Sequence, residues 1–246
     1  MLDKSQIQKI TIEFYSHFCD TDLEKFLPGI QFICTPEREK IIKGFGCPYG
    51  IYVLVRENQA VIAFSPKYQE FMDDLKVLPE KEILSAIRGK YAMKEMKLFI
   101  FDKEKVEEFG EARVLNLSNY ALFKTFFCTA NPEADPEGWL EDYFTEKVKK
   151  GYFTGYFKEN QLVSVCDAPD MPFMEGRIQH TGITTLSRER GKGYGKCTAA
   201  LATHNLLAKG ICPQWECDVN NVASCKLAKS IGYREFGTAY ILEEWD

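Results

Sequence analysis

The sequence predicts an α/β (α+β) fold, a mixed central sheet with flanking helices, preceded by a smaller α+β N-terminal domain. Two observations lead to this prediction. The stretch from 178 to 242 alternates β-rich runs with helical patterns, as α/β proteins do. A charged segment with little to bury, 102–110, separates the second part of the chain from a first part with its own helix, hairpin and strand. We therefore expect an N-terminal domain over 1–108, of unknown role, and a second domain over 109–246.

The N-terminal domain is expected to begin with a helix. Its apolar residues fall near one helical face, namely Ile7, Ile10, Phe14 and Phe18. A β-hairpin should follow, because two β-rich runs, Ile51–Arg56 and Ala60–Phe64, are separated by a short polar turn. Helical patterns over 67–77 and 80–89 and a buried strand, Lys97–Phe101, complete this domain.

The second domain is expected to begin with a strand, Arg113–Leu117, and a helix. Ser118 or Asn119 could cap that helix, since either side chain can accept a hydrogen bond from a free N–H of the first turn. A proline-containing acidic loop at 131–138 then leads to a helix near 138–149.

The remaining elements are the clearest in the chain. Four strands are expected, Tyr152–Lys158, Leu162–Asp167, Ile178–Thr185 and Pro213–Cys217, with a helix ending near Lys209 before the last of them. A final helix should begin at Asn221 and end at Gly232, which suits a left-handed cap. The last strand is expected over Arg234–Leu242.

Composition excludes several classes of protein. The 246 residues are 45% hydrophobic and 27% charged, ordinary values for a globular protein and against disorder. A net charge of −5 argues against nucleic acid as a partner. No apolar run approaches the roughly 18 residues of a membrane span, so no membrane partner is expected. Nine cysteines without a CxxC motif indicate neither disulfide framework nor metal site, and they fit a cytoplasmic protein.

One turn, Ser187 to Lys196, carries a recognisable chemistry. It joins a β-rich strand to a helix and contains three alternating glycines, Gly191, Gly193 and Gly195. Glycines at a helix start leave backbone N–H groups uncovered, and the helix end adds partial positive charge, so a phosphate or pyrophosphate can bind there. Three side chains can add full positive charges: Arg190, Lys192 and Lys196. The turn matches neither the dinucleotide fingerprint nor the P-loop pattern.

Instead, Arg190, Gly193 and Gly195 fit the pattern [Q/R]-x-x-G-x-[G/A]. This resembles the coenzyme A pyrophosphate motif of the GNAT superfamily of N-acetyltransferases. Ile183-Thr184-Thr185 looks like the end of the family's fourth strand, whose splayed backbone usually hydrogen-bonds the pantetheine arm. The run from Trp215 to Tyr233 resembles the family's fifth strand and fourth helix. The resemblance covers roughly 111–246.

The resemblance implies acetyl-CoA as cosubstrate and a set of cofactor-binding residues. These are Ile183, Thr184, Thr185, Arg190, Gly191, Lys192, Gly193, Tyr194, Gly195, Lys196, Asn221 and Ser224. It also implies transfer of an acetyl group to an amine acceptor by direct attack on the thioester. No metal is implied.

The catalytic side chains usual in the family are missing. Fourth-strand positions that often hold Glu or His carry Gln179 and Thr181, while His180 between them should point to the opposite face. The helix position that often holds a tyrosine acid is Ala228. A base that takes a proton from the amine is still useful. The candidates for catalysis are therefore Gln179, Thr181, Glu175 and Glu216.

The acceptor is expected to be a small-molecule or peptide amine. The acidic loop between the first two helices of the second domain would favour a cationic one. Residues 1–108 could cover the acceptor site or form the interface of a homodimer. Two alternatives stay open: a GNAT-fold module that holds an acyl-CoA without turnover, and an unrelated phosphate-binding α/β protein.

Overall fold

A computed structural model describes residues 2–25, 27–106 and 109–245. The helices are α1 (Lys4–Cys19), α2 (Gln69–Leu75), α3 (Glu80–Lys90), α4 (Tyr120–Ala130), α5 (Leu140–Lys149), α6 (Tyr194–Ala208) and α7 (Val222–Ile231). The strands are β1 (Gly29–Cys34), β2 (Tyr49–Arg56), β3 (Gln59–Phe64), β4 (Lys94–Phe101), β5 (Arg113–Val114), β6 (Thr154–Lys158), β7 (Gln161–Asp167), β8 (Ile178–His180), β9 (Gly182–Thr185), β10 (Cys212–Asp218) and β11 (Tyr233–Glu243). The predicted mixed α+β fold class is confirmed.

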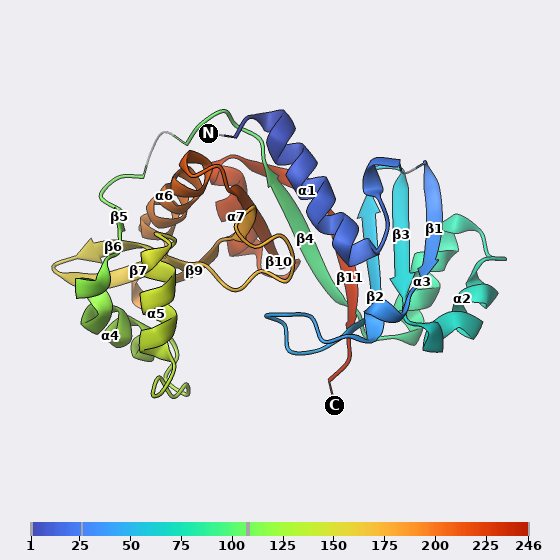
Figure 1. The fold of residues 1–246 in the computed structure, drawn as a ribbon, viewed down its shortest axis with the longest axis horizontal. Helices are drawn as coiled ribbons and strands as arrows, with labels where there is room; N and C mark the ends of the chain where they lie inside the picture. Colours follow the sequence, from blue (N-terminus) through green and yellow to red (C-terminus); the bar gives the residue numbers. More distant parts are fainter. Residues whose placement is uncertain (1, 26, 107–108, 246) are drawn as a thin grey trace.

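The strands form two sheets that meet near the middle of the chain's long axis (Figure 1). The larger sheet has the order β1-β3-β2-β11-β4-β10-β8, and the smaller has the order β5-β6-β7-β9. Helices α4 and α5 pack on the smaller sheet, while α2 and α3 lie at the far end of the larger one (Figure 1). Helix α1 packs across the middle of the larger sheet, where Phe14, Tyr15 and Phe18 are buried.

The expected strand Ile178–Thr185 is instead two strands, one in each sheet. Strand β8 runs parallel to β10, whereas β9 pairs antiparallel with β7. Thr181 lies at the exchange and remains tied to β10, because its N–H donates to the Gln214 carbonyl at 3.2 Å. The prediction of one continuous strand was wrong because a run of β-favouring residues does not reveal a change of pairing partner. The exchange splays β9 away from β10.

Strand β4 lies between β10 and β11 and is antiparallel to both. Strands from both sides of the expected boundary at residue 108 therefore form one sheet. The largest buried cluster likewise combines α1 and β2 with α6, α7 and β10. The division into 1–108 and 109–246 stays a prediction, and residues 107–108 lie outside the described residues.

The predicted N-terminal helix, first hairpin and following helices are confirmed, as are the second hairpin and the last strand. Two local expectations are wrong. The strand expected over Arg113–Leu117 ends at Val114, because a 3-10 turn, Leu117–Asn119, precedes α4. Asn119 is the N-cap residue of α4, but its side chain accepts no hydrogen bond from that helix. The side-chain cap lies at the start of the 3-10 turn, where Asn116 Oδ1 accepts from the Ser118 N–H at 2.9 Å. The Asn119 side chain in turn accepts a hydrogen bond from the Asn116 N–H at 2.9 Å.

No helix in the described part of the chain is long and apolar enough to cross a bilayer. Within the same residues, no group of three or more His, Cys, Asp or Glu side chains could hold a metal ion.

Candidate active site

A pocket of about 480 Å³ opens where β9 and the first turns of α6 and α7 meet. Its lining consists of Ile183, Thr184, Thr185, Glu189, Arg190, Gly191, Gly193, Tyr194, Gly195, Lys196, Asn221, Ala223, Ser224 and Leu227. All the cofactor-binding residues predicted from the sequence are in this set except Lys192. The Lys192 ammonium instead pairs with Glu189 Oε2 at 2.9 Å. We call this cavity the glycine-turn pocket; the role of its residues in binding stays a prediction.

The turn before α6 folds as it does because two of its glycines adopt left-handed backbone angles. Gly191 has φ +76° and Gly193 has φ +88°, values that residues with a side chain rarely adopt. Gly193 is the N-cap of α6 and has no side chain to occupy the free N–H groups of the first turn. At Gly195, an added Cβ would lie 3.0 Å from Thr185 Oγ1, so a larger residue would press on Thr185 where α6 approaches β9. The turn therefore offers open N–H donors and the positive end of α6 to an anion.

Hydrogen bonds hold the other walls of the glycine-turn pocket in place. Arg190 Nε donates to the Thr185 carbonyl at 3.1 Å, which ties the turn to the end of β9. Asn221 caps α7 by accepting from the Ser224 N–H at 3.1 Å. The Ser224 hydroxyl in turn accepts from Trp215 Nε1 at 3.1 Å, which fixes the start of α7 over β10.

Two of the predicted catalytic side chains bond to backbone carbonyls. The Gln179 amide is buried and donates to the carbonyls of Pro169 at 2.8 Å and His180 at 3.1 Å. The Thr181 hydroxyl is also buried and lies 3.4 Å from the Gln214 carbonyl. These contacts hold the strand exchange in place and leave neither polar group facing the glycine-turn pocket.

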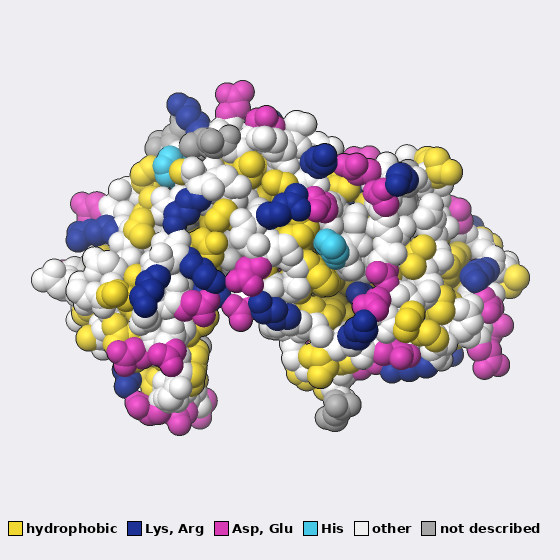
Figure 2. Space-filling view, in the orientation of Figure 1, with side chains coloured by type: hydrophobic (Ala, Val, Ile, Leu, Met, Phe, Trp, Pro, Cys, Tyr) yellow, Lys and Arg dark blue, Asp and Glu magenta, His cyan; other side chains and the backbone are white. Residues whose placement is uncertain are grey.

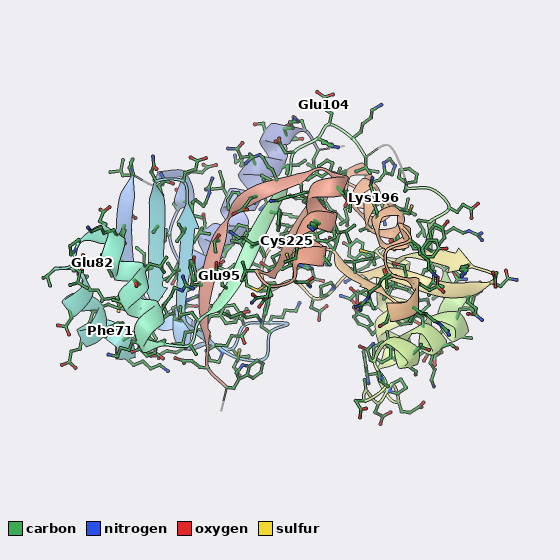
Figure 3. The ribbon with its side chains drawn as sticks, turned by 180° about the vertical axis from the view of Figure 1, so that it is seen from behind. Phe71, Glu82, Glu95, Glu104, Lys196 and Cys225 are labelled. Carbon is green, nitrogen blue, oxygen red and sulfur yellow. The ribbon has the colours of Figure 1, made fainter. Side chains whose placement is uncertain are left out.

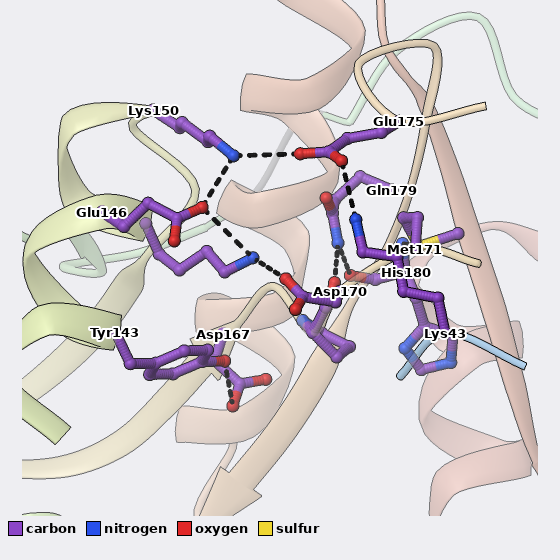
Figure 4. A network of polar contacts seen from close by, with 12 residues as sticks. Lys43, Tyr143, Glu146, Lys150, Asp167, Asp170, Met171, Glu175, Gln179 and His180 are labelled. Atoms are coloured by element: carbon purple, nitrogen blue, oxygen red, sulfur yellow. Dashed lines mark hydrogen bonds and ion pairs between the residues drawn. The ribbon is translucent and has the colours of Figure 1, made fainter. Parts of the chain in front are cut away.

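Glu175 belongs to an exposed ion-pair network (Figure 4). Its carboxylate pairs with Lys43 at 3.0 Å and with Lys150 at 3.1 Å. Hydrogen bonds from both lysines hold the pKa of Glu175 below its ordinary value. A carboxylate stabilised in this way is a weak proton acceptor, and the network instead joins the loop before β2 to α5.

Glu216 lies in a different environment. Along β10 it alternates with Trp215 and Cys217, which face α7, so its carboxylate faces the opposite side of the sheet. There it lines a small cavity of about 20 Å³ with Phe18, Phe45, Tyr49, Tyr52, Lys94, Met96 and Ile241. Burial raises the pKa of Glu216 to about 7, although Gln214 Nε2 donates to it at 3.3 Å. We call this cavity the aromatic cavity.

Every ring of the aromatic cavity comes from the N-terminal part of the chain. Phe18 stacks on Tyr52 with ring centroids 5.1 Å apart, and Phe45 meets Tyr49 edge-on at 5.4 Å. No sequence motif marks these four residues. Aromatic residues recur along α1 and β2, but nothing in that pattern indicates that they meet β10.

Asp167 is a second carboxyl with a raised pKa, and it was not among the candidates predicted from the sequence. Burial raises the pKa of Asp167 to about 6. It ends β7 opposite Gly182 of β9, and an added Cβ on Gly182 would clash with its Oδ1. Its Oδ2 accepts from the Tyr143 hydroxyl at 3.5 Å. The signal in the sequence that could have identified Asp167 is an acidic residue at the end of an apolar strand.

His180 lies behind Glu216 and is a neutral packing residue. Its Nε2 accepts from the Glu216 N–H at 3.3 Å, and burial lowers its pKa to about 4.

The surface between the two ends of the molecule is hollowed, with acidic and basic side chains around its rim (Figure 2). The acidic loop between α4 and α5 is exposed at the lower end of the smaller-sheet lobe (Figure 1).

The chain matches a protein-family model described as GNAT acetyltransferase over residues 90–242. It is 28% identical over 99 residues to the uncharacterized N-acetyltransferase YdfB of Bacillus subtilis (strain 168), an alignment that covers 39% of this chain. The chain thus spans 37% of the length of that curated relative.

Solved structures of two proteins were compared with this chain. A GNAT-family acetyltransferase from Colwellia psychrerythraea is 16% identical with a TM-score of 0.52, covering 61% of this chain and 56% of that one. A GCN5-related N-acetyltransferase-like protein from Streptococcus suis 89/1591 is 14% identical with a TM-score of 0.47, covering 98% and 99% of the two chains.

Proposed function

Because this chain belongs to the GNAT acetyltransferase family, we propose that it transfers an acetyl group from acetyl-CoA to an amine. The glycine-turn pocket is the observation that supports this proposal best. Three separate segments of the sequence meet there, at the open N-terminus of α6. The N–H groups of the first turn and Lys196 fit a pyrophosphate, and β9 offers its backbone to the pantetheine arm. Acetyl-CoA bound there would supply an activated thioester.

The acceptor would approach from the opposite face of the sheet. The glycine-turn pocket includes residues of α7, which packs against Trp215 and Cys217, whereas Glu216 faces the aromatic cavity. The regular pairing of β8 with β10 ends at His180 and Gln214, and β9 then departs to the smaller sheet. Two substrates that enter from opposite faces would meet at this gap without crossing each other.

Glu216 is our candidate for the general base. A carboxyl with a pKa near 7 is a good proton acceptor at neutral pH. The amine would form a C–N bond with the acetyl carbon as the C–S bond breaks, its proton would pass to Glu216, and the CoA sulfur would leave as the thiolate. Four aromatic rings beside a carboxylate also favour a cationic amine. Asp167 is less suited, because its two oxygens pack against Gly182 and the Tyr143 hydroxyl.

Calorimetry with acetyl-CoA tests the pocket assignment. Gly193→Leu should abolish binding, because its side chain would enter the glycine-turn pocket. Gly210→Leu is the matched control: Gly210 follows the other end of α6, also has a left-handed φ, +73°, and also has no atom within 4 Å of an added Cβ. Backbone strain is thus comparable in both variants. Unchanged affinity in Gly193→Leu, or equal loss in both, would contradict the assignment.

One observation favours a second candidate, a module that binds acyl-CoA without turnover. The helix position expected to hold an acid is Ala228, which is buried, and the nearby Tyr233 hydroxyl lies 2.9 Å from Thr203 Oγ1. Tyr233 therefore does not replace the missing acid at this position. A thiol-release assay with a panel of small and peptide amines separates the two candidates. Release of CoA supports the enzyme, and tight binding without release with every amine supports the module.

A further inference from the structure

A second pocket, of about 560 Å³, adjoins the glycine-turn pocket. Its walls are the start of α1, the segment 102–106 that follows β4, and one face each of α6 and α7. Lys196 lines both pockets, so the two cavities are neighbours along α6. We call this second cavity the lysine pocket. Segment 102–106 belongs to the part of the chain whose role the sequence left open.

The sheet fixes segment 102–106 over the end of α7. Phe101 of β4 pairs with Tyr233 of β11, and the next N–H, that of Asp102, donates to the Gly232 carbonyl at 3.0 Å. Asp102 Oδ2 also accepts from Arg234 Nε at 3.0 Å. The stem of Lys103 then lies over Gly232, where an added Cβ would be only 2.6 Å from Lys103 Cδ.

Positive charge predominates among the described residues of the lysine pocket. These include four lysines and two acidic residues. Asp102 is neutralised by Arg234 and by Lys4, the latter at 3.6 Å. Glu104 projects at the outer edge of the molecule, well away from Lys196 on α6 (Figure 3). Among the described residues, no carboxylate forms an ion pair with Lys103 or Lys196. Two uncompensated cations therefore face one cavity beside an anion-binding turn.

We propose that the lysine pocket binds the 3′-phosphoadenosine end of CoA, with Lys103 and Lys196 contacting the 3′-phosphate. This inference rests on the proposed function, because it requires the pyrophosphate to lie at the glycine turn. CoA carries its 3′-phosphate beyond the pyrophosphate, and a phosphomonoester bears close to two negative charges at neutral pH. The shared Lys196 lies between the two phosphate positions. The N-terminal part of the chain, through Lys103, thereby completes the cofactor site.

The test compares CoA with 3′-dephospho-CoA by calorimetry at fixed salt. The wild-type chain should bind CoA about tenfold more tightly, as expected for a charge-assisted contact. Lys103→Met retains an apolar stem over Gly232 and removes only the charge. It should weaken CoA about tenfold and leave the affinity for 3′-dephospho-CoA unchanged. Lys229→Ala is the matched control, since it removes an exposed cation of α7 that lines neither pocket, and it should preserve the tenfold preference.

Three outcomes would overturn the inference. Equal affinity of the wild-type chain for the two ligands excludes a 3′-phosphate contact while leaving the proposed function intact. Equal weakening of both ligands by Lys103→Met assigns the lysine a structural role. If neither CoA nor 3′-dephospho-CoA binds the wild-type chain, the proposed function is overturned together with this inference.

Discussion

At the scale of single residues, Glu216 combines a cost in stability with a proposed catalytic role. Its pKa is about 7 in the folded chain because burial disfavours the charged form, against an ordinary value of 4.5. Between these two values the unfolded chain releases the proton first. The free energy of unfolding therefore falls as pH rises from about 4.5 to about 7. Above pH 7 it stays lowered by a constant amount, because Glu216 is then charged in both the folded and the unfolded chain.

Glu216→Gln should separate the two effects. At pH 8 the variant should be more stable than the wild-type chain, by on the order of 1–3 kcal/mol in urea denaturation, because the buried charge is gone. Its acetylation rate should fall by roughly a hundredfold or more. The wild-type rate should rise through pH 7, and the variant should lose that rise. A variant with wild-type rates at every pH would exclude Glu216 as the base.

Glu175→Gln is the companion variant for this experiment. In the wild-type chain, Lys43 and Lys150 lower the pKa of Glu175, and the Glu175 carboxylate is exposed. We expect an unchanged acetylation rate and a loss of at most about 1 kcal/mol per ion pair, the usual upper range for exposed pairs. A large loss of rate with Glu175→Gln, measured by thiol release, would instead identify Glu175 as the base.

At the scale of elements, the 3-10 turn Leu117–Asn119, which leads into α4, offers a direct test of capping. Asn116 accepts a hydrogen bond from the Ser118 N–H, and Asn119 accepts one from the Asn116 N–H. Asn116→Ala should lower the free energy of unfolding by about 1 kcal/mol, because an N–H of that turn loses its acceptor. Asn116→Asp keeps the acceptor and should retain most of the stability. Equal stability of the alanine variant and the wild-type chain in urea denaturation would mean that water replaces the cap.

Elements specified by neighbouring residues were predictable, and those specified by distant partners were not. The cap at Asn221 and the end of α7 at Gly232 follow from local side-chain and backbone preferences. The glycine turn was recognisable for the same reason. The exchange at Thr181 depends on β7 and β10, which lie far away in the sequence. Periodicity therefore predicted the strand but not its division between two sheets.

At the scale of the whole molecule, the proposed site draws on both halves of the chain. Residues of the glycine-turn pocket all come from the second half and were accessible through motif spacing. The aromatic cavity and the lysine pocket depend on α1, β2, β4 and the segment after β4. No motif marks those segments, because what places them is the insertion of β4 into the larger sheet.

The insertion of β4 leads to a prediction about folding. Strand β4 pairs with β10 over five residues and with β11 over eight. A fragment of residues 109–246 contains the described lining of the glycine-turn pocket but lacks β4. Strands β10 and β11 would then have unpaired edges, and the buried apolar residues that pack against the N-terminal part of the chain would be exposed. The fragment should therefore fail to bind acetyl-CoA in calorimetry. Adding a fragment of residues 1–108 should restore binding, whereas 1–89, which ends before β4, should not. Binding by 109–246 alone, with the affinity of the full chain, would show instead that the second half folds independently and that β4 is dispensable for the pocket.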